Sequence, residues 1–161
     1  MYKRQPLDQV DSGFFNSSAK FSDNVDMVKG SLFEGGIRVP SFVTWPRKIK
    51  EGSFSNHISS TQDFYATILD LFKIKKPNHI TGLSFLPTLL GKKQNKHEYL
   101  YWETNSRQGQ QALRMDKWKA IRRNLATGNK EIELFDLTLD SKEKNDVSKS
   151  NLDVISQIEI I

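Results

Sequence analysis

The sequence predicts an α/β fold, and three features of its 161 residues lead to this expectation. Residues 37–45, IRVPSFVTW, form a short β-branched run between Gly36 and Pro46, which favours a buried strand over a helix. Residues 62–73 carry apolar side chains at helical spacing, and residues 98–137 contain several short runs typical of strands. We therefore expect one strand of a parallel or mixed sheet, a helix packed on it, and a smaller antiparallel sheet near the C-terminus.

The first element begins with the loop KGSLFEGG, which carries the cation Lys29 and the carboxylate Glu34. Two adjacent glycines, Gly35 and Gly36, supply backbone freedom at the end of this loop. Pro40 has no backbone N–H to donate. It should therefore lie at the start of the predicted strand over residues 37–45, or that strand should be at the edge of its sheet. A loop cation beside a strand end suits an anionic ligand, although a lone lysine is more commonly a solvated surface charge.

The clearest helix spans residues 62–73 and presents one apolar face, made by Phe64, Tyr65, Ile68, Leu69 and Phe72. Ser60 or Thr61 can cap its N-terminus, and Asp63 suits its first turn. For Asp63 we prefer this capping role to a catalytic one. Residues 82–91, GLSFLPTLLG, predict a short helical turn that Pro87 limits.

The C-terminal region follows a basic linker at residues 92–96 and is predicted to be mostly strands. The expected strands are residues 98–103, 111–115, 118–122 and 131–137. Met115-Asp116-Lys117 is a hairpin candidate, and strand periodicity places Trp118 and Ala120 on one face with Ile121 on the other, beside Lys119. Residues 151–161 close the chain as an amphipathic helix with Leu152, Ile155 and Ile158 on one face.

Composition excludes several kinds of site. The chain has no cysteine, which removes disulfides, thiolate metal sites and a thiol nucleophile. No apolar run approaches the ~20 residues that span a bilayer, and no signal peptide is visible. The net charge is +5, but no nucleic-acid-binding motif accompanies it, so we expect no nucleic-acid partner.

Several motifs in order resemble the sulfatase family of the alkaline-phosphatase superfamily. The run from Lys29 to Pro40 is similar to the family signature K-x-x-x-x-E-G-G followed by Arg and Pro. Further matches are GLSFLPTLLG, HEYLYWE, QALRMDKWKAIR and ELFDLTLDSKEKNDV, and FFNS at Phe14 resembles the N-acetylgalactosamine-6-sulfatase-like subgroup. The chain as a whole is most similar to N-acetylgalactosamine-6-sulfatase and arylsulfatase-type bacterial enzymes. The resemblance implies a C-terminal fragment of an alkaline-phosphatase-like fold, with a remnant of the central sheet, a small antiparallel sheet and a terminal helix.

The resemblance also implies roles for individual residues. Lys29 corresponds to the lysine that contacts the sulfate ester and the catalytic formylglycine. Four residues beside it are interpreted as structural, tying the loop to the strand end: Glu34, Gly35, Gly36 and Arg38. Three residues near a strand end are candidates for substrate binding, Trp102, Glu103 and Arg107, although packing of Trp102 in the core is slightly favoured.

Other parts of the family's chemistry cannot be mapped onto this sequence. Formylglycine is made from Cys or Ser in C/S-x-P-x-R, a motif the chain lacks, and calcium needs about six to eight oxygen ligands. The pair Asp23-Asn24 lies too close to Lys29 to match the Asp-Asn pair that binds calcium in the family, so no metal ligand is assigned. The sequence also has Asp26-Met27 where family members usually carry Arg-Gly. His57, His79 and His97 show no ligand spacing and are expected to be surface or packing histidines. The chain alone is therefore expected to be inactive.

The expected organisation has three parts. Residues 1–5, MYKRQ, resemble a translated sequencing adapter and are left out; residues 6–91 are a remnant of the catalytic domain, and residues 97–161 are the C-terminal subdomain. The resemblance implies that the intact parent hydrolyses sulfate esters, with carbohydrate sulfates as the expected substrates. The formylglycine and the calcium ion would belong to a missing N-terminal portion. Family resemblance implies a periplasmic or secreted location. Two alternatives remain: a phosphate-ester or phosphonate hydrolase of the same superfamily, and a non-catalytic module that binds sulfated glycans.

Overall fold

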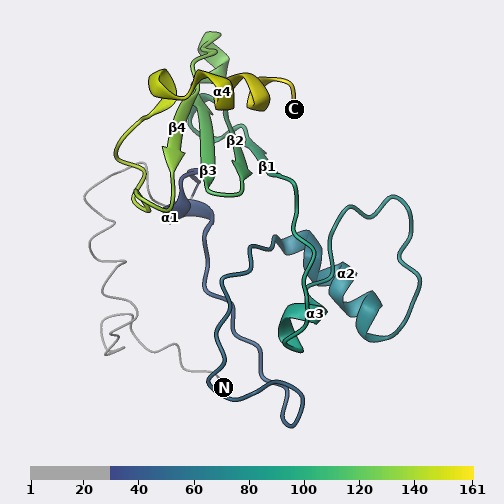
Figure 1. The fold of residues 1–161 in the computed structure, drawn as a ribbon. Coiled ribbons are helices and arrows are strands. Elements are labelled where there is room, and N and C mark those ends of the chain that lie inside the picture. Colours follow the sequence, from purple (N-terminus) through teal and green to yellow (C-terminus); the bar gives the residue numbers. More distant parts are fainter. Residues whose placement is uncertain (1–29) are drawn as a thin grey trace, which may run out of the picture. The chain divides into compact units, whose positions relative to one another are not determined.

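The computed structural model describes residues 30–161, which divide into two compact units (Figure 1). The sheet unit contains residues 30–39 and 101–161, and the helical unit contains residues 40–100. Lys29, Asp23-Asn24 and the adapter-like N-terminus lie outside the described residues. The sequence did not predict that residues 30–39 belong with the C-terminal sheet.

The sheet unit holds four strands in the order β1-β2-β3-β4. Their bounds are Leu100–Thr104, Gln110–Met115, Trp118–Arg123 and Glu133–Asp136. Strand β3 pairs antiparallel with both β2 and β4, and Met115 lies opposite Trp118. The turn between them is Asp116-Lys117, with Asp116 in the left-handed region at φ 51°. The predicted antiparallel sheet and hairpin are thus confirmed.

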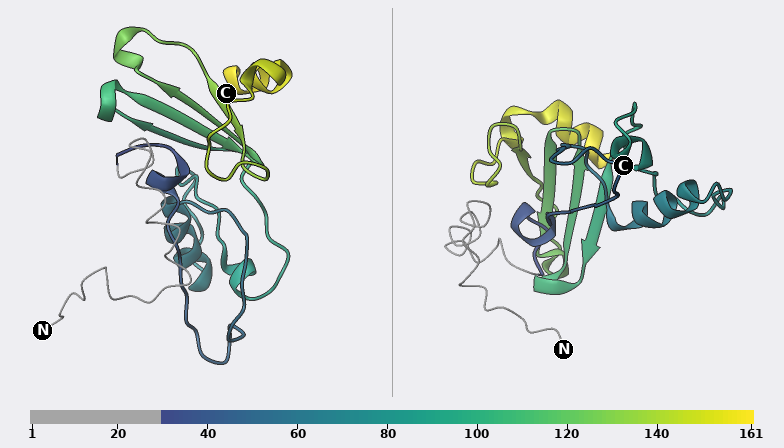
Figure 2. Two further views of the ribbon diagram at one scale, coloured as in Figure 1. Left: turned by 90° about the vertical axis from the view of Figure 1, so that its left-hand side faces the viewer. Right: turned by 90° about the horizontal axis from the view of Figure 1, so that it is seen from below.

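The two faces of this sheet are covered by different segments. Helix α4, Leu152–Glu159, packs Val154 and Ile158 against a face that includes Ala120. On the opposite face Ile121 packs with Leu32 and Phe33, just before the short helix α1, Glu34–Ile37. Figure 2 shows α1 and α4 on opposite sides of the sheet. This confirms the predicted alternation along β3.

The terminal helix is confirmed as an element, but its buried face differs from the prediction. Leu152, expected to face the core, is exposed, whereas Val154 and Ile158 are buried and Ile155 is partly buried. Leu152 and Val154 lie about 200° apart around the helix axis, so the face that buries Val154 and Ile158 leaves Leu152 on the other side. The prediction was therefore right for Ile158, wrong for Leu152, and missed Val154.

The predicted strand over residues 37–45 is wrong. Ile37 ends helix α1, and residues 38–45 belong to no strand. Phe42 is 81% exposed and Val39 is also exposed. A strand needs neighbours for its backbone hydrogen bonds, and within residues 30–161 the sheet β1–β4 does not supply them to this segment. The apolar, β-branched composition therefore did not suffice to form a strand.

The loop predicted for KGSLFEGG is also partly wrong, because helix α1 begins at Glu34. Gly35 and Gly36 lie inside this helix, and neither adopts a positive φ. The sequence predicted that these two glycines supply backbone freedom, but a helical conformation does not require it.

The helical unit contains α2, Thr61–Leu71, and the short α3, Leu86–Leu89, which confirms both predicted helical segments. The predicted apolar face of α2 is mostly exposed, including Phe64 and Ile68. Of that face only Leu69 is buried, and the helix also buries Ala66 and two polar residues of its first turns. Within this unit α2 packs beside residues 82–86 rather than on a strand, with the Phe64 and Phe85 rings edge to face at 5.5 Å.

Lys73 follows α2 in a left-handed conformation, with φ 56°, and donates its N–H to the carbonyl of Asp70. The sequence placed Lys73 in the last helical turn, so the helix ends earlier than predicted. No helix between residues 30 and 161 has the length and apolar character needed to cross a membrane.

Candidate functional site

The segment directly after Lys29 is firmly held in the sheet unit. Residues 31–34 are all buried. The N–H of Leu32 donates to Gln110 Oε1 at 3.2 Å, and the Phe33 ring packs against Phe135 with centroids 5.9 Å apart. Lys29 itself lies outside the described residues, so its predicted contact with sulfate stays a prediction. The structure does establish that the chain is anchored from Ser31 onward.

Glu34 is the most highly connected residue of this segment. Its side chain is buried, and Oε1 lies 3.1 Å from Lys119 Nζ on β3, while Oε2 lies 3.3 Å from an Arg114 nitrogen on β2. The exposed Arg38 is 3.9 Å away, one helical turn on. The predicted tie from Glu34 thus runs to strands β2 and β3, not to a strand over residues 37–45.

Lys119 and Glu143 complete what we call the buried charge cluster, formed with Glu34 and Arg114. Lys119 is fully buried, and Glu143 is 4% exposed. Glu143 Oε2 accepts the Glu34 backbone N–H at 2.6 Å, while its Oε1 lies 3.7 Å from Lys119 Nζ and accepts no hydrogen bond from the described residues. Burial raises the Glu143 pKa to about 7, against the opposing effects of Lys119 and the Glu34 N–H.

Sequence reasoning missed this cluster, although one signal was present. Lys119 was predicted to share a face with Ile121, and a covered face would bury both. A lysine at that position needs a carboxylate partner, because an unpaired buried charge is strongly unfavourable. Nothing in the local sequence indicates that the partners come from residues 34 and 143.

The three predicted substrate-binding residues lie in or after β1 but do not form one surface. Trp102 packs against the core cluster around Ile121, with its ring centroid 5.4 Å from Lys119 Nζ. Glu103, on the opposite face, is exposed. Arg107 is exposed in the turn that follows, at φ 52°. Their role in substrate binding stays a prediction.

Glu103 has its own hydrogen-bond partners. It accepts hydrogen bonds from the Tyr101 hydroxyl and, at 3.3 Å, from Gln111 Nε2. These bonds stabilise the ionised form and lower the Glu103 pKa. Burial and the same hydrogen bond raise the pKa of Tyr101. Glu103 is therefore a carboxylate at neutral pH.

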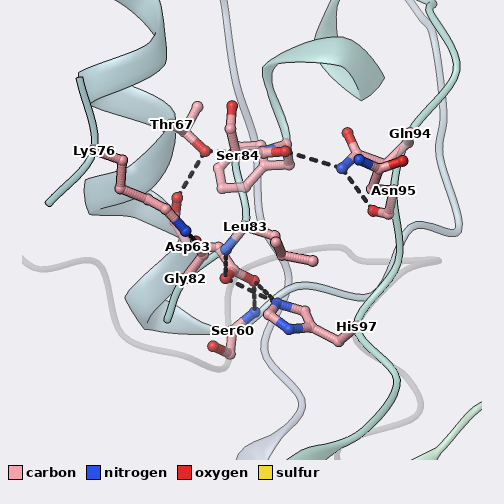
Figure 3. A network of polar contacts seen from close by, with 11 residues as sticks. Ser60, Asp63, Thr67, Lys76, Gly82, Leu83, Ser84, Gln94, Asn95 and His97 are labelled. Atoms are coloured by element: carbon pink, nitrogen blue, oxygen red, sulfur yellow. Dashed lines mark hydrogen bonds and ion pairs between the residues drawn. The ribbon is translucent and has the colours of Figure 1, made fainter. Parts of the chain in front are cut away.

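A second polar network centres on Asp63 in the helical unit (Figure 3). Asp63 is completely buried. Its Oδ2 accepts the Ser60 N–H at 2.7 Å and its Oδ1 accepts the Leu83 N–H at 2.8 Å. His97 Nε2 lies 2.9 Å from both oxygens. The bond to Ser60 confirms the predicted capping role, while the bonds to Leu83 and His97 extend it to two distant segments.

The same network attaches the basic linker to the helical unit. Gln94 accepts bonds from the backbone N–H and hydroxyl of Thr88 and donates to the carbonyl of Ser84, as Figure 3 shows in part. His97 was predicted to be a surface or packing histidine, and it is instead a partner of Asp63 with 13% of its side chain exposed. Both Asp63 oxygens are committed to structural hydrogen bonds, so this arrangement holds segments together and offers no free catalytic base.

The remaining histidines give no metal site. Burial lowers the pKa of His57, which is half-buried near Asp63 and His97. Among residues 30–161, no three side chains of His, Cys, Asp or Glu are grouped so that they could hold a metal ion. The calcium ion implied by the family resemblance therefore has no ligand set in the described part of the chain.

A family model described as N-sulphoglucosamine sulphohydrolase, C-terminal, matches residues 27–159. The chain belongs to the sulfatase family. Its sulfatase relatives include N-acetylgalactosamine-6-sulfatase of Mus musculus, 35% identical over 80 residues, covering 48% of this chain and 15% of that protein. N-acetylgalactosamine-6-O-sulfatase of Bacteroides thetaiotaomicron is 29% identical over 143 residues, covering 81% of this chain and 27% of that protein.

Solved structures agree with this membership. A protein in complex with its substrate D-glucosamine-2-N,6-O-disulfate superposes with a TM-score of 0.59 and 25% identity, over 71% of this sulfatase chain and 26% of that one. The structure of Ps i-CgsB matches with the same TM-score and 29% identity, over the same shares of the two chains. The alkaline-phosphatase-like α/β fold class predicted from the sequence is therefore confirmed, and the sulfatase chain spans about a quarter or less of these relatives.

Proposed function

We propose that this sulfatase chain is the C-terminal part of an enzyme that hydrolyses sulfate esters of carbohydrates, with amino-sugar sulfates as the substrate class. The observation that supports the proposal is the family match over residues 27–159, which includes Lys29 and the Glu34-Gly35-Gly36 sequence. The named relatives act on sulfated N-acetylgalactosamine or carry a sulfated glucosamine. A periplasmic or secreted location belongs to the same proposal.

In this proposal Lys29 stabilises negative charge on the sulfate. An ammonium group is a compact charge on a long stem, so it can follow the oxygens of the sulfate as the ester bond breaks. Charge stabilisation of this kind acts most strongly in a water-poor site. Calcium and a formylglycine nucleophile would supply sulfate binding and covalent chemistry, from residues outside this chain.

The test is hydrolysis by the full-length protein that carries this chain. We expect sulfate release from N-acetylgalactosamine 6-sulfate and little phosphate release from the matching phosphate ester. Lys29→Ala should lower turnover by about 10²- to 10³-fold, the loss typical of an oxyanion donor, and Lys29→Arg should restore part of it. Lys48→Ala, at an exposed lysine of the helical unit, is the matched control and should remain active.

Two results would reject parts of the proposal. Release of phosphate without sulfate would assign the enzyme to the phosphate-ester or phosphonate alternative. Near-normal sulfate release by Lys29→Ala would remove Lys29 from the site while leaving the sulfatase activity in place.

One observation favours a second candidate, binding of sulfated glycans without chemistry. Residues 40–100 contain nine Lys and Arg against four Asp and Glu, so the whole net charge of +5 falls within the helical unit. If this charge binds sulfated glycans, the isolated chain should be retained on heparin and released by salt. Elution at the ionic strength of a weakly basic control protein would exclude this second function.

A further inference from the structure

The segment that follows Lys29 is fastened at one residue by three charged groups. Glu34 contributes both its side chain and its backbone N–H: the carboxylate pairs with Lys119 and Arg114, and the N–H donates to Glu143. Lys119 also lies 3.7 Å from Glu143, so Glu34, Lys119 and Glu143 contact one another in a closed ring. The proposed function gives no role to Lys119 or Glu143.

Lys29 is joined to this attached segment by a very short stretch of chain. Lys29 is two residues before Ser31, and consecutive Cα atoms lie 3.8 Å apart. Only two peptide units therefore separate Lys29 from the first buried residue of the segment. Since Ser31 and the next three residues are buried, any movement of this segment moves the base of the lysine side chain.

We infer that Lys119 and Glu143 are positioning residues, which hold residues 31–34 on the sheet and thereby fix the point from which Lys29 reaches the sulfate. The last step of this inference rests on the proposed function of Lys29. The first step, attachment of the segment, concerns described residues alone and can be tested separately.

Charged groups suit this task better than apolar ones. Apolar contacts at Leu32 and Phe33 tolerate small shifts, whereas a carboxylate and an ammonium in contact fix the distance between α1 and β3. The groups that face Glu143 are Lys119 from β3, the Glu34 carboxylate and N–H from α1, and Asp140 from its own loop. Arg114 of β2 balances the charge of Glu34. A buried ion cluster of this type gives specificity of position more than net stability.

Titration of Glu143 provides a signature of this attachment. Burial raises its pKa from 4.5 to about 7. An opening that exposes Glu143 to water returns the pKa to its ordinary value, so the open form loses its proton first as pH rises. Opening therefore becomes easier between pH 4.5 and 7, by up to about 300-fold, and changes little at higher pH.

The first experiment measures hydrogen exchange of residues 30–38 in this chain from pH 5 to 8, corrected for intrinsic exchange rates. We expect protection to fall by 10- to 100-fold up to pH 7 and then level off. Glu143→Gln should remove this pH dependence. The matched control Lys117→Met breaks an ion pair with Asp136 in the same sheet and should keep it. Glu143→Ala, which removes the acceptor of the Glu34 N–H, should speed exchange at residues 30–38 at every pH, and unchanged exchange in this variant would overturn the attachment.

The second experiment measures kcat and KM of the full-length enzyme, normalised to the folded fraction. Glu143→Ala, which removes the acceptor of the Glu34 N–H, and Lys119→Met should lower kcat about 10- to 100-fold, since small misplacements of a catalytic group have effects of this size. Glu143→Gln mimics the neutral carboxyl group and keeps an acceptor, so it should stay close to wild type. Lys117→Met should stay within about twofold. If Lys119→Met does not fold, Glu143→Ala decides alone.

The two experiments separate the inference from the proposed function. A wild-type enzyme without sulfate release rejects the proposed function and with it the catalytic step, while exchange still decides the attachment. An active enzyme whose Glu143→Ala variant exchanges faster at residues 30–38 but keeps normal kcat overturns the positioning role and leaves the proposed function standing.

Discussion

Asp63 should be the most sensitive position of the helical unit. Its carboxylate accepts hydrogen bonds from the backbone N–H groups of Ser60 and Leu83 and contacts His97 Nε2. The Asp63 residue itself has no exposed surface. Alanine would leave these groups without an acceptor, and each unpaired buried group costs about 1–3 kcal/mol. We therefore expect Asp63→Ala to destabilise the unit by about 3–5 kcal/mol, a large share of the stability of a small domain.

Asparagine offers a milder change at the same site. It keeps one oxygen and replaces the other with an NH₂ group, so one of the two backbone N–H groups meets a donor instead of an acceptor. The expected loss is about 2–3 kcal/mol, one buried unpaired donor plus the weaker remaining bonds. The difference between Asp63→Ala and Asp63→Asn then measures the acceptor that asparagine retains.

The measurement is hydrogen exchange of the α2 amides, which reports the opening free energy of this unit without requiring the whole chain to unfold together. Asp70→Asn is the matched control, because Asp70 lies on the same helix, is exposed and accepts a bond from the Ser84 hydroxyl. It should change the opening free energy by less than about 0.5 kcal/mol. An equally small change for Asp63→Asn would refute the assignment of Asp63 as the central acceptor.

Three further outcomes follow from local geometry. Gly82→Ala should cost about 1–3 kcal/mol in urea unfolding, because its Cβ would lie 2.4 Å from the Gln62 carbonyl oxygen; a stability equal to wild type would show that α2 moves aside freely. Lys73→Gly should raise Tm, with a gain of about 0.5–1 kcal/mol from relieving a left-handed residue after α2, and a lower Tm would contradict this. Tyr101→Phe should raise the Glu103 pKa toward its ordinary value in an NMR titration, since it removes the first cause of the lowering; an unchanged titration curve would exclude that hydrogen bond.

The sequence determined the elements whose information is local. Alternation over residues 111–122 was enough to place two strands and their turn, because each side chain's face follows from its position in the strand. The helix at residues 61–71 and its cap by Asp63 were likewise predictable from spacing and from a first-turn carboxylate. The family motifs identified the same relatives as the later comparisons.

Tertiary structure decided whatever depends on a partner far along the chain. Residues 37–45 have the composition of a strand, yet strand formation needs a neighbouring edge, which no local pattern can report. The buried side of α2 was set by Gly82 and Leu83 approaching it, not by its own apolar stripe. Lys119 meets Glu34 and Glu143 across 85 and 24 residues of sequence, and its burial follows from that meeting because an ammonium leaves water only for a carboxylate.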